Sequence, residues 1–289
     1  MNRNLVRTLT NEFSNMLTSQ PKPLISVVSA SWNQGAYIEE CIKSVQGLEP
    51  GMLEHIVIDN CSDDETHEVL KSHPWVKATT ESDSGQSNAL NKGFQQARGE
   101  WVLWLNVDDF LVPGALKCLL EWIEQEGKNF DMAYGYTVFV DADSKKIRTI
   151  FQPQWHYWMT KWGGFVAPST GSLFRASILK GNPLDEDFHM IMDTEWMLRV
   201  GRQLRVRRLN LEIVSFRIAD NKTAAHIQSG VVTPRHQQER LALLQKFPFY
   251  CGEGQGVIKM LKRKFVRLFV LGGKAFCYLR AMMGREGAP

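Results

Sequence analysis

Residues 101–110, WVLWLNVDDF, begin as an apolar run and end in two adjacent carboxylates, Asp108 and Asp109. The apolar part predicts a buried strand. Neighbouring carboxylates disfavour each other's ionisation, so a cation close by is needed to keep both charged. The stretch therefore predicts a strand that delivers a pair of acids to a cation-binding site at its carboxyl end.

Strands and helices alternate on the N-terminal side of this stretch. Apolar and β-branched runs predict three strands, at 24–31, 53–60 and 75–80. Helical patterns lie between them, at 36–47 and 86–99, and Ser62 with Glu65 resembles a capping box that opens a further helix. This order predicts an α/β fold with a parallel sheet, helices on both faces, and ligands at the carboxyl ends of the strands.

Acidic residues stand at three of the expected strand ends: Asp59, Asp83 and the Asp108–Asp109 pair. A single acid in such a place is about as often a turn former or a helix cap as a ligand. Three acids from neighbouring strands converge on one crevice, so together they favour a binding site.

The second half has a different pattern. Residues 132–152 predict two strands joined by a polar turn, and 190–202 predict a helix, which together indicate a mixed, partly antiparallel extension of the sheet. Between them lies an unusual density of aromatics: Trp155, Tyr157, Trp158, Trp162 and Phe165. These rings fit equally well a surface that stacks on sugars or a satellite core beneath the extension.

The composition, 44% hydrophobic and 22% charged, is that of a globular chain. The net charge of +3 is unevenly distributed: residues 257–289 carry eight Lys/Arg and one acid (+7), whereas the rest carries 26 and 30 (−4). Because the basic charge is confined to the tail, the main body is not expected to bind nucleic acid.

The tail stretch 256–283 combines apolar and basic positions at helical spacing. It is expected either to lie on an anionic membrane surface or to pack on the body or on a second subunit. No signal peptide or transmembrane span is recognisable, and the five cysteines include no C-x-x-C pair. We therefore expect a cytoplasmic chain, peripheral at the inner face of a membrane if the tail binds lipid.

Four stretches, in this order, resemble inverting family 2 glycosyltransferases of the GT-A fold: ISVVSASWNQGAYIEECIKSV (25–45), IVIDNCSDDET (56–66), SDSGQSNALNKGFQQARGEWVLWLNVDD (82–109) and DEDFHMIMDTEWMLR (185–199). The resemblance implies a Rossmann-like central mixed sheet flanked by helices, with a smaller antiparallel extension and a C-terminal helical tail. The expected division is a lead segment (1–23), a GT-A domain (24–250, split at 110/111 into nucleotide-binding and acceptor halves) and a basic tail (251–289).

The resemblance also implies a donor site for a nucleoside diphosphate sugar. Ala30, Ser31 and Asp59 match residues of the base pocket, and Asp83 and Gln86 match positions near the nucleoside or sugar. A lone carboxylate at Asp59 suits a base with a ring N–H, which favours a UDP- or dTDP-linked donor.

The family's D-x-D motif maps onto Asn106-Val107-Asp108, followed by Asp109, so an Asn replaces the first Asp. A hard divalent cation, Mn²⁺ or Mg²⁺, is expected to join Asp108 or Asp109 to the diphosphate as a Lewis acid. Asn106 still offers a carbonyl oxygen to a ribose hydroxyl or a metal-bound water.

Asp193 is the expected general base, because it occupies the Asp of the family's E-D-x-D-like motif and shares a helix face with Trp196 and Met197. Partial desolvation raises the pKa of such a carboxylate and suits it to accept a proton. The alternative is a first-turn helix acid that only favours the dipole.

Acceptor contacts are expected at Ser169, Thr170, Trp158 and Trp196. The stretch SFRIADNKT (215–223) matches a family stretch that often reads F-R-x-H-x-x-S-K-T; here Ala219 stands at the His position, Lys222 and Thr223 are retained, and His226 follows nearby.

The resulting hypothesis is an inverting transferase that moves a sugar to a glycan or lipid-linked acceptor, of unknown oligomeric state. The alternative is a catalytically silent module that binds sugar nucleotides or glycans. A nucleotidyltransferase is disfavoured, because the first strand is followed by SASWNQGAY rather than a Gly-rich basic loop.

Overall fold

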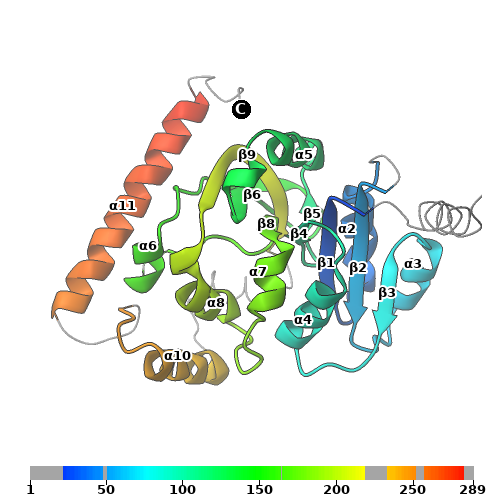
Figure 1. The fold of residues 1–289 in the computed structure, drawn as a ribbon, viewed down its shortest axis with the longest axis horizontal. Helices are drawn as coiled ribbons and strands as arrows, with labels where there is room; N and C mark the ends of the chain where they lie inside the picture. The colour runs from blue at the N-terminus through cyan, green and yellow to red at the C-terminus, as the bar shows by residue number, and fades with distance from the viewer. Residues whose placement is uncertain (1–21, 48–50, 164, 219–232, 252–256, 283–289) are drawn as a thin grey trace, which may run out of the picture.

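The computed structural model describes residues 22–47, 51–163, 165–218, 233–251 and 257–282 (Figure 1). Within these residues one nine-stranded mixed sheet runs in the order β3-β2-β1-β4-β8-β6-β9-β5, with β7 paired to β6. Its N-terminal half consists of parallel strands at the predicted places: β1 (Ile25–Ser31), β2 (Leu53–Asp59), β3 (Lys77–Thr80) and β4 (Trp101–Trp104).

Helices cover both faces of this half, as the alternation predicted. Successive side chains of a strand point to opposite faces. Val28 packs with α4 (Gln86–Gln96), α7 (Ala176–Gly181) and α8 (Met192–Val200) on one face. On the other face, Val27 packs with α2 (Gly35–Ser44) and α5 (Ala115–Gln125), while Val57 packs with α2 and α3 (Thr66–Ser72).

The second half continues the same sheet with the predicted mixed geometry. β8 (Ser172–Arg175) is antiparallel to β4 and to β6 (Met132–Val140), and β7 (Lys146–Ile150) is antiparallel to β6. β9 (Val206–Arg217) runs parallel to β6. The short β5 (Phe110–Leu111) pairs with β9, so the acidic turn between β4 and β5 is held by both halves of the sheet. The 3-10 turns Gly127–Asn129 and Gly201–Gln203 complete this part.

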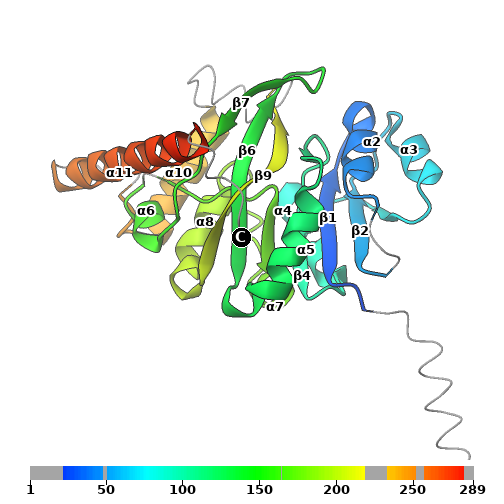
Figure 2. The same ribbon diagram turned by 90° about the horizontal axis from the view of Figure 1, so that it is seen from above.

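The C-terminal helix α11 (Val257–Met282) lies at one edge of the molecule, at the opposite end from α3 (Figure 2). Val266 and Val270 of α11 pack on α6 (Tyr157–Lys161), against Met159 and its neighbouring aromatic rings. In the part of the chain that is described, no helix combines the length and apolar character needed to cross a membrane.

Candidate active site

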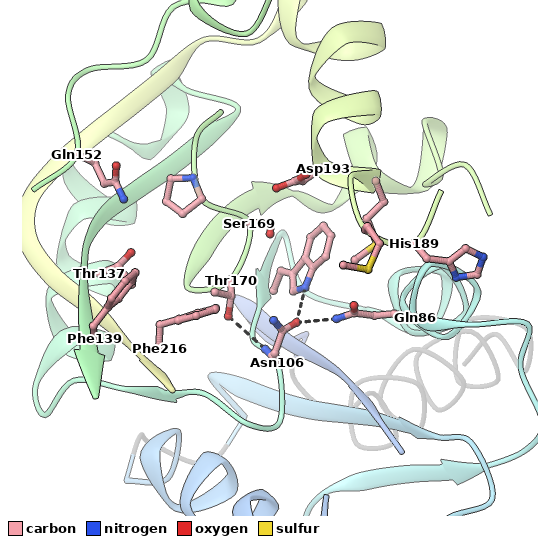
Figure 3. Close-up of a pocket in the computed structure, with 14 residues that line it drawn as sticks. Gln86, Asn106, Thr137, Phe139, Gln152, Ser169, Thr170, His189, Asp193 and Phe216 are labelled. Carbon is pink, nitrogen blue, oxygen red and sulfur yellow. Dashed lines mark hydrogen bonds between the residues drawn. The ribbon is translucent and has the colours of Figure 1, made fainter. Parts of the chain in front are cut away.

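A pocket of about 280 Å³ opens where the two halves of the sheet meet (Figure 3). One wall comes from the carboxyl end of β4 and the start of α4, another from β6 and β9, and a third from the segment that leads into α8. The polar lining residues are Gln86, Asn106, Thr137, Gln152, Ser169, Thr170, His189 and Asp193. The structure thus brings five predicted site residues together: Gln86, Asn106, Ser169, Thr170 and Asp193.

Asn106 makes several hydrogen bonds to other residues of the pocket lining, drawn as dashed lines in Figure 3. Its Oδ1 accepts hydrogen bonds from Gln86 Nε2 and from the indole N–H of Trp104, both at 3.1 Å. An indole N–H only donates, so the amide orientation is fixed by this contact. The expectation that the Asn106 carbonyl serves a ligand is therefore corrected: that oxygen already has two donors, and the NH₂ group is the part of the side chain able to donate to a ligand.

The two acids after β4 differ in their surroundings. Asp109 is 1% exposed, and its oxygens accept hydrogen bonds from the Arg217 backbone N–H (3.1 Å) and the Thr170 hydroxyl (2.9 Å). Burial, and next the charge of Asp108, raise the pKa of Asp109 well above its ordinary value. Asp108 is half-buried. The geometry thus favours Asp108 over Asp109 as a direct metal ligand and gives Asp109 a structural task in the turn.

Asp193 lies in the first turn of α8 and lines the pocket. Its Oδ1 accepts hydrogen bonds from the N–H of Thr194 at 2.6 Å and from the Thr194 hydroxyl at 3.3 Å. Burial raises the pKa of Asp193, partly offset by these bonds. A carboxylate with a raised pKa, in a pocket, has the properties of a proton acceptor near neutral pH.

The residues predicted for the base pocket lie at the carboxyl ends of β1 and β2. Asp59 is fully buried, and its carboxylate accepts hydrogen bonds from the N–H (3.0 Å) and hydroxyl (2.5 Å) of Ser62. Ser62 therefore holds Asp59 and does not cap α3, whose N-cap residue is Glu65. Ala30 is half-buried and Ser31 is buried, and the Ser31 hydroxyl has no hydrogen-bond partner among the described residues.

Asp83 precedes α4 and shapes the turn there. Its backbone N–H donates to Asn60 Oδ1 at 2.9 Å, and its carboxylate accepts from the Gly85 N–H at 2.8 Å. Burial raises the pKa of Asp83. Like Ala30, Ser31 and Asp59, it stands outside the described pocket lining, on the side of β1–β3.

Both tryptophans predicted as acceptor contacts are packed elsewhere. Trp196 is 3% exposed, donates its indole N–H to the Asn182 carbonyl at 2.7 Å, and stacks edge-on against Phe174. Trp158 contacts Phe265 and Phe269 of α11. Trp158, Trp162 and Phe165 thus form a packing surface for α11, and neither Trp158 nor Trp196 is carried further as an acceptor residue.

Several residues of the site were not predicted. Phe139, Phe216, Gln152 and His189 line the pocket, although none of them was predicted as a site residue. Arg217 is 2% exposed and donates from Nε to the Asp108 carbonyl at 3.2 Å. The dipeptide Phe216-Arg217, which opens the stretch that resembles F-R-x-H-x-x-S-K-T, was a usable signal for it. Ala219, Lys222, Thr223 and His226 lie outside the described residues.

The described residues contain no group of three or more His, Cys, Asp or Glu side chains placed to hold a metal. A cation here would need oxygens from a ligand besides Asp108. That is the usual arrangement for Mg²⁺ with phosphate substrates, in which one or two carboxylates suffice.

Comparison with known proteins agrees with this geometry. The family model described as glycosyl transferase family 2 matches residues 26–182. A Bacillus subtilis glycosyltransferase, TuaG, whose name assigns it to teichuronic acid biosynthesis, is 29% identical over 138 residues (46% of this chain, 54% of TuaG). The Campylobacter jejuni GalNAc(5)-diNAcBac-PP-undecaprenol beta-1,3-glucosyltransferase is 29% identical over 195 residues (61% of this chain, 59% of that protein). The chain thus spans between half and three-fifths of these relatives.

Solved structures show the same fold at low sequence identity. S. aureus TarS in complex with UDP-GlcNAc superimposes with a TM-score of 0.62 at 16% identity, covering 86% of this chain and 71% of TarS. The mannosyltransferase PcManGT from Pyrobaculum calidifontis, in complex with GDP-Man and Mn²⁺, gives 0.54 at 16% identity, covering 94% and 77%. The expected GT-A fold is confirmed, and because the family model covers more than half of its length, this chain belongs to glycosyl transferase family 2.

Proposed function

We propose that this chain transfers a sugar, with inversion, from a nucleoside diphosphate sugar to a glycan or lipid-linked acceptor. The observation that carries the proposal is that Asn106, from the acidic turn, and Asp193, from α8, line one pocket. A group that can contact the diphosphate of the donor and a group that can accept a proton are therefore available around a single reacting centre.

The donor nucleoside is assigned to the carboxyl ends of β1–β3. The unpartnered, buried Ser31 hydroxyl supports this, because a buried hydroxyl without a partner is costly and a ligand would satisfy it. Asp59 has lone pairs left for a ring N–H, so UDP or dTDP is the proposed carrier. Since Asp59 is fully buried, binding requires a shift of the loop around Ser62.

Asp108 is the proposed metal ligand, with Asn106 directing its NH₂ group towards the donor. A Mn²⁺ or Mg²⁺ ion bound there would supply Lewis-acid stabilisation of the leaving diphosphate. Arg217 and Thr170 hold the turn in place through the Asp108 carbonyl and the Asp109 carboxylate.

Asp193 is the proposed general base. It accepts the proton of the attacking acceptor hydroxyl while the new bond forms at the anomeric carbon and the bond to the diphosphate breaks on the opposite face. One displacement inverts the configuration at that carbon. Ser169, Thr170 and the ring of Phe216 are the proposed acceptor contacts, because they line the same pocket.

Calorimetry with UDP, dTDP and GDP, with and without Mn²⁺, tests the donor site. Asp108→Asn is expected to abolish the metal-dependent part of binding, whereas Asp193→Asn is expected to bind normally and lose transfer. A chain that binds nucleotide but transfers no sugar from any donor would support the silent-module alternative instead.

We further propose that α11 rests on an anionic membrane at the cytoplasmic face, where a lipid-linked acceptor would be held. Val266, Val270 and Cys277 face the body, and at 100° per residue the opposite side is apolar and exposed. Leu261, Leu268 and Leu279 lie on this side, and each of them is at least 55% exposed. Exposed Lys264 and Arg267 flank this side, and each basic residue near an anionic surface contributes about 1 kcal/mol.

Co-sedimentation with phosphatidylglycerol and phosphatidylcholine vesicles tests the membrane proposal. The double variant Leu261→Gln/Leu268→Gln is expected to release the protein from the anionic vesicles. Leu241→Gln serves as the control, since Leu241 is equally exposed (56%) but lies on α10 (Pro234–Lys246). Unchanged vesicle binding in the double variant, or conversion of a dimer to a monomer without any vesicle binding, would contradict the proposal.

A further inference from the structure

The catalytic helix α8 begins without a cap from its own sequence. Its N-cap position is Ile191, which has no side-chain oxygen to accept the orphan N–H groups of the first turn. Glu239 of α10 instead binds the N–H groups of the segment that enters the helix: its Oε1 accepts from the N–H of His189 at 3.0 Å. Its Oε2 accepts from Met190 at 2.8 Å and from Ile191 at 3.2 Å.

Glu239 is a buried carboxylate, 5% exposed, whose ion pair with Arg235 is long at 3.5 Å. Its bonds to three consecutive peptide N–H groups are therefore the main offset to the cost of burying its charge. A second contact lies further along both helices, where Lys246 of α10 pairs with Glu195 of α8 at 2.9 Å. Leu243 of α10 and Phe247, directly after this helix, lie in the same core cluster as Met197. Helix α10 thus holds α8 at two points.

The segment held in this way is a wall of the active-site pocket. His189, Met190, Met192 and Asp193 all line it, and Glu239 bonds to the backbone of the first two and to the N-cap of the helix that carries Asp193. We infer that Glu239 is a positioning residue for Asp193, supplied by α10 from outside the residues that match the family model. This inference rests on the proposed role of Asp193 as the base.

The carboxylate has two properties that its close analogues lack. In Glu239→Gln, the NH₂ group would face a peptide N–H, because an amide has only one accepting oxygen. The variant also removes a negative charge beside the start of α8, where the helix dipole favours one. Glu239→Asp keeps the charge, but it is shorter by one methylene and reaches fewer of the three N–H groups.

The test compares Glu239→Gln and Glu239→Asp with Gln238→Ala, an exposed position on the same helix. For each variant, UDP affinity, kcat, KM, the pH profile of kcat/KM and Tm are measured. Glu239→Gln is expected to lower kcat about 10- to 100-fold with UDP affinity within twofold of wild type. The acid limb of the kcat/KM pH profile of Glu239→Gln is expected to move about 0.2–0.7 pH unit lower, because the lost negative charge no longer opposes ionisation of Asp193. Glu239→Asp is expected to recover part of kcat, and Gln238→Ala to match wild type.

A kcat for Glu239→Gln within twofold of wild type would overturn the inference. So would a parallel fall of kcat, UDP affinity and Tm with an unmoved acid limb, which would indicate a purely structural contact. Asp193→Asn separates this from the proposed function. If Asp193→Asn transfers sugar at the wild-type rate, the base assignment fails and the inference with it; if only Glu239→Gln is unimpaired, the inference alone fails.

Discussion

Replacing Arg217 by methionine tests how the acidic turn is held. The guanidinium has five N–H donors, and the structure gives each an acceptor: the carbonyls of Asp108, Asp141 and Ala142, the Ser144 hydroxyl and the Glu40 carboxylate. It also lies over the Tyr37 ring, 4.6 Å from the centroid. At 2% exposure, the Arg217 side chain is shielded from water by these partners.

The magnitude follows from what the variant leaves behind. Three main-chain carbonyls lose a charged donor. Ala142 is exposed and the Asp141 carbonyl keeps its bond from the Ser144 N–H, whereas a shielded acceptor left unsatisfied, as at Asp108, costs about 1–3 kcal/mol. Glu40, with 40% of its side chain exposed, regains water and adds little. Because such contributions are not additive, we expect Arg217→Met to lower the free energy of unfolding by about 3–5 kcal/mol, the usual cost of breaking a buried charged network.

Urea unfolding at pH 7 measures this loss, provided that the slope against denaturant is unchanged. Arg205→Met is the matched control. Arg205 directly precedes β9, the strand that ends at Arg217, and it binds Asp131 through two nitrogens at 2.9 Å. Its side chain is 60% exposed, so a clearly smaller loss is expected. If Arg217→Met destabilises no more than Arg205→Met, the argument from burial is refuted.

Three further outcomes follow. Asp193→Asn is expected to lower kcat about 10²- to 10⁴-fold in steady-state assays; in wild type, activity falls as pH drops through the raised pKa of Asp193, because the base must be ionised. Asp109→Asn is expected to raise Tm at pH 7 in metal-free buffer, because the pKa of Asp109 is raised in the folded state and its ionisation therefore opposes folding. This gain in Tm disappears below about pH 4, where the carboxyl group is protonated in the unfolded chain as well. A gain that persists at pH 3 would contradict this. Gly85→Ala is expected to lower Tm and reshape the pocket, since the new Cβ lies 2.5 Å from the His189 ring at a φ of +133°; an unchanged melting curve would refute the clash.

Much of the N-terminal half of the sheet could be predicted from local sequence. The end of β2 at Asp59 and the turn after β4 that contains Asp109 are visible because apolar runs stop abruptly there, and parallel strands bring their carboxyl ends to one edge. The convergence of Asn106 and Asp193 on one pocket needed the resemblance as well, because 86 intervening residues carry no periodic signal that relates them.

The limits of prediction appear at Ser62 and Trp158. Ser62 fits a capping box by spacing, yet its hydroxyl donates to Asp59, since that buried carboxylate is the stronger acceptor within reach. Trp158 fits a sugar platform by composition, yet its ring packs on Phe269, which lies more than a hundred positions away. Composition records which groups are able to stack and does not record what covers them.

The sequence by itself determined the alternating elements, the placing of acids at strand ends and the charge asymmetry of the tail, because each depends on neighbours within a few residues. Only the tertiary structure decided the different burial of Asp108 and Asp109, the orientation of the Asn106 amide and the hydrogen bonds from Glu239 to the segment before α8. Those depend on which donors and acceptors meet in space. The bond between Arg217 and Glu40 joins residues 177 positions apart, and no local pattern specifies such a pair.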